Sequence, residues 1–222
     1  MQNINFLPWI GKNYQTGLGS KGLRVLVLGE SHYCFTLGQG KCPGCSLQNC
    51  IAAGFTKEDF EQQTIEYIKD ILFNNKGLPY QQTALSFERA IVGKKKLTQA
   101  EREDFWNSVI FYSYIQKSLP KLDGKRTEFT ANDLVGSDSA FDFILGTYLP
   151  DLIIVWGFRL FKILPPWGSV RSELELSSGE KTDIRMYYVC GKSIPAIKVA
   201  HPSCPKGRQW EYWHQFYDVF LE

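Results

Sequence analysis

The sequence predicts an α/β protein that forms one domain over residues 1–222, a three-layer αβα sandwich around a central, mainly parallel four-stranded sheet. Two observations predict this class. Four short runs are mainly apolar at successive positions, which is typical of strands buried on both faces. Helical patterns separate these runs, and such alternation favours parallel strands joined by crossover helices. The runs occupy residues 24–28, 108–115, 151–157 and 194–199.

The first half of the chain follows its strand with a loop and several helices. The loop is glycine-rich and extends over residues 33–55. Thr56 precedes acidic residues, which favour the first turn of a helix. Thr98 stands three residues before Glu101, which is the spacing of a capping box. The expected helices run from Thr56 to about Leu72, from Thr83 to Val92 and onward from near Thr98.

The second half of the chain repeats the strand and helix pattern and ends in an aromatic-rich helix. One helix is expected to begin at Asn132 or Ser137. Strands at residues 186–190 and 194–199 flank a Gly-Lys pair, which predicts a hairpin. Cys190 would then be a small core residue within a strand. The remaining helices are expected over residues 158–164 and from about Lys206 to Leu221.

The composition is that of an ordinary globular protein. The 222 residues include 25 Lys and Arg and 23 Asp and Glu, and a net charge of +2 does not by itself indicate nucleic-acid binding. No apolar run is long enough to cross a bilayer, and the first residues lack the features of a secretory signal. These features predict a cytoplasmic protein without membrane contact. The sequence leaves the oligomeric state open, and we favour a monomer. Disulfides are rare in that compartment, so the six cysteines indicate metal binding or redox chemistry.

Polar residues follow two of the predicted strands, where open parallel sheets bind their ligands. Glu30, Ser31 and His32 follow the first strand, and His201 and Ser203 follow the last. Glu30 could activate a water molecule, and His201 could stabilise a developing oxyanion or act as an acid or base. Ser31 could be a nucleophile, although serine at a strand end is more often a turn residue. The alternative for each residue is a structural role, such as capping loop amides.

Four of the cysteines have the spacing C-x7-C-x2-C-x4-C within the glycine-rich loop. They are Cys34, Cys42, Cys45 and Cys50. The two residues between the middle pair let both sulfurs point at one ion, so the pattern predicts a tetrahedral zinc site that orders the loop. An iron–sulfur cluster is also chemically possible. His32 could replace one of the cysteines, and the alternative is a set of unliganded thiols.

Basic residues follow the last strand. Lys206 and Arg208 stand where the final helix is expected to begin. Side-chain charge together with the backbone amides of a helix N-terminus suits a phosphate group. The alternative is an ordinary solvated helix start, which we favour for the lysine triplet at residues 94–96.

Four short motifs occur along the predicted strands in a defined order. They are Gly-Glu-Ser-His-Tyr at 29–33, Phe-Tyr-Ser-Tyr at 111–114, Val-Trp-Gly at 155–157 and Ala-His-Pro-Ser at 200–203. This order resembles the uracil-DNA glycosylase superfamily. In that family the first strand ends in a water-activating motif that begins with Gly and then Gln or Glu, and the last strand ends in His-Pro-Ser. The resemblance covers about residues 24–220, and its specificity lies in the order and strand-end placement of the motifs.

The resemblance implies a site for a base that is flipped out of DNA. By this resemblance His201 would stabilise negative charge on the departing base, and Glu30 would lie beside the attacking water. Tyr33 or Phe35 would stack on the base. Ser31 stands where the family commonly has an aspartate, and Ser113 is nearest to the position of the asparagine that reads uracil. The expected substrate contacts are His32, Tyr33, Phe35, Ser113 and Ser203.

Three functional hypotheses follow. The first is a uracil-DNA glycosylase-like protein that hydrolyses the N-glycosidic bond of a flipped base in DNA, with residues 204–208 in the minor groove. The second is a serine hydrolase, because Gly-Glu-Ser at 29–31 is one step from a Gly-Asp-Ser motif, and Glu211 and His214 could mimic a late acid–histidine pair. The third is a non-catalytic nucleic-acid or protein-binding module on the same scaffold, since fold alone does not establish catalysis.

Overall fold

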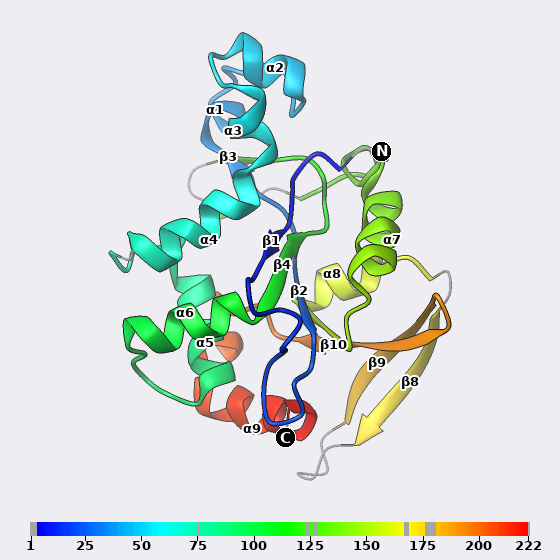
Figure 1. Cartoon of the computed structure of the whole chain (residues 1–222). Coiled ribbons are helices and arrows are strands. Elements are labelled where there is room, and N and C mark those ends of the chain that lie inside the picture. The colour runs from blue at the N-terminus through cyan, green and yellow to red at the C-terminus, as the bar shows by residue number, and fades with distance from the viewer. Residues whose placement is uncertain are drawn as a thin grey trace.

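The described part of the chain forms a seven-stranded mixed sheet with helices on both faces. The computed structural model describes residues 4–74, 76–122, 125–126, 128–166, 169–175 and 181–221. In these residues the strand order is β1-β4-β2-β7-β10-β9-β8 (Figure 1). The strands are β1 (Trp9–Ile10), β2 (Val25–Gly29), β4 (Val109–Ser113), β7 (Leu152–Trp156), β8 (Ser169–Glu175), β9 (Lys181–Val189) and β10 (Lys192–Val199).

The four strands expected from the sequence form the parallel centre of this sheet. Leu26 of β2 pairs with Ile110 of β4 on one side and with Ile153 of β7 on the other, and β10 pairs in parallel with β7. The expected count of four strands for the sheet was too small, because β1, β9 and β8 add antiparallel strands at its edges. The sequence pattern missed β1 because it is only two residues long. It missed β8 because Ser-Val-Arg-Ser-Glu-Leu-Glu is too polar for a buried strand.

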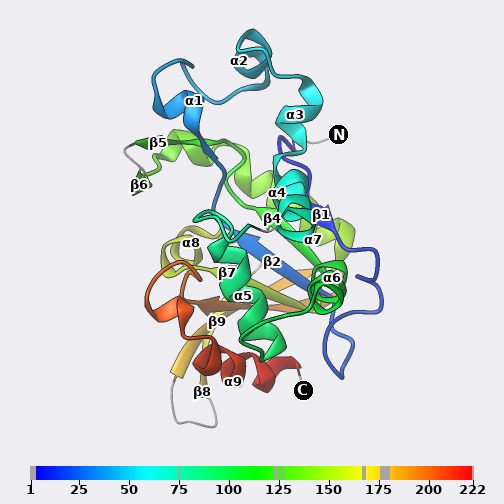
Figure 2. The same cartoon turned by 90° about the vertical axis from the view of Figure 1, so that its left-hand side faces the viewer.

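Two hydrophobic cores separate the sheet from the helices on its two faces, which confirms the three-layer arrangement (Figures 1 and 2). Val25 and Val27 of β2 face one core, and Leu26 and Leu28 face the other, as the alternation of a strand requires. The first core includes residues of α4 (Gln63–Phe73), α5 (Gln82–Val92), α6 (Gln99–Asn107) and α9 (Trp210–Leu221). The second includes residues of α7 (Ser137–Tyr148) and α8 (Phe158–Ile163).

Several helix ends differ from the sequence expectation. The capping box predicted at Thr98 is present, and Thr56 forms another with Asp59. The helix that follows Thr56 is broken at Gln62, so α3 (Lys57–Glu61) and α4 are separate. The remaining differences concern two 3-10 turns. Residues Ala131–Leu134 precede α7, which begins at the later of its two expected starts, and Lys206–Arg208 precede α9, which begins at Trp210.

The expected loop at residues 33–55 contains short elements, and we call this segment the cysteine lobe. It holds β3 (Tyr33–Cys34), α1 (Phe35–Gly38) and α2 (Leu47–Ala52). β3 joins β5 (Leu119–Leu122) and β6 (Lys125–Arg126) in a second, three-stranded sheet. Figures 1 and 2 both draw α1 and α2 at the top of the molecule, apart from the central sheet.

The predicted hairpin of β9 and β10 is confirmed, but Cys190 is not a core residue. It lies in the turn between the two strands, where it is exposed and has a φ of 49°. The expectation failed because the strand ends one residue earlier, at Val189. Among the described residues, no helix is long and apolar enough to cross a membrane.

Ionic groups connect three parallel strands at their amino ends, opposite the end that carries Glu30 and His201. Asp151 precedes β7 and accepts hydrogen bonds from the backbone N of Arg24 at 2.8 Å and from its Nε at 3.1 Å. Lys192, the first residue of β10, also donates to Asp151. Burial opposes ionisation of Asp151, but these hydrogen bonds outweigh it and lower its pKa to about 2.

Asp151→Asn is predicted to remove an acid-sensitive part of the folding stability. The pKa of Asp151 is about 2 in the folded protein and about 4 in an unfolded chain. Its stabilising contribution is therefore complete above about pH 4 and is lost as the pH falls toward 2. Between about pH 4 and pH 2, the free energy of unfolding measured with denaturant should fall by about 2 kcal/mol less in the variant than in the wild type. Asp142→Asn, at an exposed position on α7, is the control. Equal losses in wild type and Asp151→Asn would contradict the prediction.

Candidate functional site

Glu30 and His201 lie in the wall of one pocket of about 900 Å³. β2 and β10 both pair with β7, so their carboxyl ends are roughly 10 Å apart. That volume is in the usual range of ligand pockets. The pocket is lined by residues 29–34 and by Cys50, Phe55, Asp59, Phe60, Gln63, Glu66, Tyr67, Pro79, Tyr80, Thr83, Phe111, Ser113, Lys121, Trp156, His201 and Ser203.

Backbone hydrogen bonds hold the motif at residues 29–33 against the chain that follows β4. The donors are the amides of Tyr114, Ile115 and Leu119, and the acceptors are the carbonyls of Gly29, Glu30 and His32, at 2.8 to 2.9 Å. The β2–β4 pairing thus continues into the β3–β5 pairing. The motif has a defined backbone path, which orients its side chains at the pocket.

Glu30 forms a bidentate ion pair with Arg159, a residue that the sequence analysis missed. Nε of Arg159 donates to Oε2 of Glu30 at 2.8 Å, and its Nη2 donates to Oε1. The hydroxyl of Tyr33 also donates to Oε1, at 3.1 Å. The Glu30 side chain is only 7% exposed. Hydrogen bonding to Glu30 raises the pKa of Arg159, so the guanidinium is charged. Both carboxylate oxygens of Glu30 have donors.

The rule that ligands bind beyond the carboxyl ends of parallel strands would have predicted Arg159. It lies two residues after Gly157, at the carboxyl end of β7. Polar residues directly follow β2 and β10, whereas an aromatic residue separates Arg159 from Gly157 after β7, so only the two outer strand ends were recognised from the sequence.

The hydrogen bonds of His201 define its neutral tautomer. The backbone N of Ser203 donates to Nδ1 of His201 at 3.3 Å, and the Ser203 hydroxyl lies 2.8 Å from the same atom. Because an amide can only donate, Nδ1 is an acceptor and the neutral ring carries its proton on Nε2. The ring also packs edge-on against Trp156. A Cβ on Gly207 would lie 2.0 Å from the His201 carbonyl oxygen, so the close approach of this loop requires glycine.

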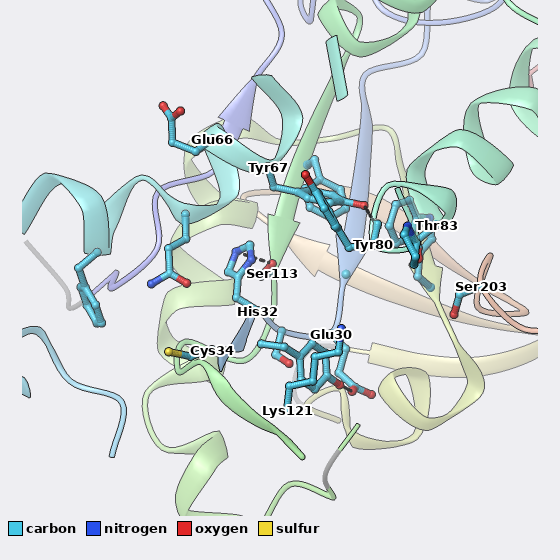
Figure 3. A pocket seen from close by; sticks show the side chains of 18 of the residues that line it. Glu30, His32, Cys34, Glu66, Tyr67, Tyr80, Thr83, Ser113, Lys121 and Ser203 are labelled. Atoms are coloured by element: carbon cyan, nitrogen blue, oxygen red, sulfur yellow. Dashed lines mark hydrogen bonds between the residues drawn. The ribbon is translucent and has the colours of Figure 1, made fainter. Parts of the chain in front are cut away.

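His32 is a neutral group at the pocket wall. Its Nε2 lies 2.7 Å from the hydroxyl of Thr64 and 3.1 Å from that of Ser113, the bond drawn in Figure 3. The ring also packs edge-on against Phe6. Burial lowers the pKa of His32 to about 4. Ser113, expected from the sequence to contact substrate, lines the pocket and bonds this imidazole.

Ser31 lacks the partner of a serine nucleophile. Among the described residues, its buried hydroxyl has no hydrogen-bond partner. His214 is on α9, where its Nδ1 donates to the carbonyl of Ala90 at 3.1 Å, and it does not line the pocket. A serine hydrolase requires a base within hydrogen-bond reach of the nucleophile, so this arrangement does not favour that hypothesis.

Aromatic side chains form much of the pocket wall. Tyr33 lines it as expected, and the side chain of Phe35 lies outside the described part of the chain. Tyr67 and Tyr80, which the sequence analysis missed, lie across the pocket from Glu30 in Figure 3. The hydroxyl of Tyr80 donates to Asp70 at 2.6 Å. These rings give the pocket flat apolar surfaces on which a planar ligand could stack.

The thiols of the cysteine lobe lie within reach of one another's charge. Burial raises the pKa of Cys50 to about 11, and the thiols of Cys45, Cys34 and Cys42 also raise it. Burial likewise raises the pKa of Cys45, with further increases from Cys34 and Cys42. All four are free and partly buried. In the described ranges, no three His, Cys, Asp or Glu side chains already converge as a metal site.

Lys206 and Arg208 are exposed in the turn that follows the last strand. Lys206 and Arg159 line a smaller pocket of about 230 Å³, which shares Glu30 and His201 with the larger one. Two of the nearby amides already have acceptors. The amide of Gly207 donates to Sγ of Cys204, and that of Arg208 to the Cys204 carbonyl. A phosphate contact here would therefore depend on the basic side chains, because the expected helix N-terminus is a 3-10 turn.

Comparison with known proteins adds no relative. No protein-family model matches the chain, and no curated protein is significantly similar to it. The residues and geometry of this pocket are therefore the basis for assigning a function.

The imidazole of His32 is predicted to stay neutral down to about pH 4. Burial disfavours its charged form, and the pKa falls from an ordinary 6.5 to about 4. Histidine side-chain NMR over pH 3 to 8 should therefore contain one resonance that titrates near pH 4. His32→Asn should remove that resonance, which assigns it. Titration of His32 near pH 6.5 would disprove the prediction.

Proposed function

We propose that this protein hydrolyses the N-glycosidic bond of a base flipped out of DNA, as the resemblance to the uracil-DNA glycosylase superfamily implies. One observation carries the proposal. A carboxylate and an Nε2-protonated histidine, Glu30 and His201, follow two parallel strands and line the same ligand-sized pocket. Bond cleavage creates positive charge on the sugar and negative charge on the base, which are the charges that these two groups can stabilise.

His201 has the role of an electrophilic donor. Its Nδ1 accepts from the amide of Ser203, so Nε2–H is the donor for the developing anion on the base. A neutral imidazole can act in this way at neutral pH without taking a proton from solvent. Ser203 is a positioning residue, because its contacts set the tautomer and the orientation of the ring.

Glu30 has an electrostatic role in this proposal. Arg159 and Tyr33 donate to its oxygens, so the carboxylate is held in place by charge-assisted hydrogen bonds. It would therefore orient the attacking water and stabilise the cationic sugar. The C–N bond breaks with its electrons going to the base. Water supplies hydroxide to the sugar carbon, and its proton ends on the released base or in solvent.

The surrounding side chains suit a nucleotide substrate. Tyr67 and Tyr80 offer ring faces for stacking on a flipped base, which is a common means of holding it. Lys206 and Arg208 are exposed in the loop after His201, and phosphate contacts there would offset the cost of unstacking, a few kcal/mol.

Substitution of either central residue is predicted to suppress base release. His201→Ala removes the donor to the leaving base and should lower the rate about 100- to 1,000-fold. Glu30→Gln keeps the side-chain shape and removes the charge, and we expect a loss of about 100-fold or more. The assay incubates single- and double-stranded oligonucleotides, each with one uracil or other modified base, and measures free base by mass spectrometry.

Two controls make that assay decisive. Cys190→Ser, at an exposed hairpin turn that lines neither of the two pockets described above, should keep wild-type activity. Thermal unfolding of each variant separates loss of chemistry from loss of fold. No base release from any substrate, or release that is unaffected by His201→Ala, would refute the proposal.

DNA affinity is predicted to depend on the loop after the last strand. Lys206→Ala and Arg208→Ala should each weaken binding to all DNA sequences and reduce the slope of log affinity against log salt by about 1. Lys95→Ala makes the same charge change at an exposed position of the lysine triplet and should leave binding unchanged. Fluorescence anisotropy at several salt concentrations measures both quantities. Equal effects of all three substitutions would indicate only a general charge effect.

The second candidate is a non-catalytic binding module. It is favoured by the hydrogen bonds of Arg159 to both carboxylate oxygens of Glu30, because they occupy the group that would orient the water. If this candidate is correct, DNA or protein binding should survive His201→Ala, and the wild type should release no base. The base-release and anisotropy measurements together distinguish the two functions.

A further inference from the structure

The cysteine lobe has a chemistry that base hydrolysis does not use. Its four cysteines come from three neighbouring parts of the chain. Cys34 is in β3, Cys42 and Cys45 lie between α1 and α2, and Cys50 is in α2. The described structure uses none of them in a disulfide.

The turn that carries the middle pair is held by local hydrogen bonds. Nδ2 of Asn49 donates to the Gly44 carbonyl at 2.7 Å, and Sγ of Cys42 donates to the same oxygen at 3.3 Å. The Ser46 hydroxyl accepts from the amide of Asn49 and caps α2. The segment that links Cys42 to α2 therefore has a defined conformation, with two residues between its two thiols.

Contacts near β5 place Cys45 beside the part of the chain that pairs with Cys34. The amide of Ser118 donates to Sγ of Cys45 at 2.9 Å. Ser118 directly precedes β5, in which Pro120 is paired with Cys34. Cys34 and Cys50 both line the large pocket. An amide donor to a cysteine sulfur is also the kind of outer-shell contact that supports thiolate ligands of metals.

The lobe has little apolar burial to stabilise it. α2 has no buried residue. Ile51 is 53% exposed and Phe55 is 46% exposed. Of the lobe side chains that the structure describes between residues 34 and 55, neither main core includes any. A segment of this kind needs another source of order, and a metal ion supplies one without a hydrophobic core.

We propose that Cys34, Cys42, Cys45 and Cys50 bind one structural Zn²⁺ ion. Four thiolates are a common tetrahedral ligand set for zinc. Binding requires the side chains to rotate toward one point, and each thiol releases its proton to solvent as its bond to the metal forms. Because Cys34 and Cys50 line the pocket, the ion would also stabilise the wall that follows Glu30. This inference does not depend on the proposed glycosylase activity.

Elemental analysis of the purified full chain tests the site. We expect about one zinc per chain. Cys42→Ser and Cys45→Ser should each lose the bound zinc, and Cys190→Ser, outside the lobe, should retain it. Bound iron with acid-labile sulfide would overturn the proposal in favour of a cluster. Zinc retained in full by both lobe variants would overturn the assignment of these ligands.

Thiol mapping gives an answer even if the variants fail to fold. In the wild type, the four lobe cysteines should resist iodoacetamide, while exposed Cys190 reacts. Zinc removal by a chelator should expose all four, and Co²⁺ added afterwards should give the visible absorption of tetrahedral cobalt thiolate, lost again on addition of Zn²⁺. A metal-free, folded wild type that binds neither ion and whose lobe cysteines react with or without chelator would overturn the proposal.

Discussion

Parallel pairing of β2, β7 and β10 is the constraint on which the rest of the structure depends. Parallel strands in adjacent positions end at the same edge of a sheet, so residues distant in sequence meet there. Glu30, Arg159 and His201 follow the three strands in that order. Asp151 anchors the opposite ends through Arg24 and Lys192. Because the strands are buried on both faces, a slip of one residue would turn apolar side chains to the wrong core and disperse the site.

Hydrogen bonds and burial constrain the charged and neutral groups of the pocket more than the residue types alone would. Glu30 accepts hydrogen bonds from the charged guanidinium of Arg159, and burial opposes charge on His32. His201 faces the same space with a defined tautomer. A site with these groups is suited to stabilising separated charges, and less suited to moving protons between its own residues. That property separates the glycosylase proposal from a serine hydrolase, in which Ser31 would need a base beside it.

The cysteine lobe and the pocket wall are formed by adjoining segments of the chain. The chain passes from β2 through the strand-end motif directly into β3, where Cys34 begins the lobe. Pairing of β3 with β5 then holds the lobe beside the pocket. Any ligand that orders the lobe would therefore also affect the shape of the pocket wall. The thiols of Cys42 and Cys45 are groups that could bind such a ligand.

The sequence by itself determined the layers of the fold and the two motifs at the site. Apolar runs and capping signals such as Thr98 act through near neighbours, so they are visible along the chain. Short or polar edge strands were missed because backbone pairing alone makes them strands. Only the tertiary structure decided that Arg159 neutralises Glu30, that His32 contacts Ser113 and that Cys190 lies in a turn. Such contacts depend on distances between strands, which no local pattern encodes, because side chains far apart in sequence meet only after the sheet has formed.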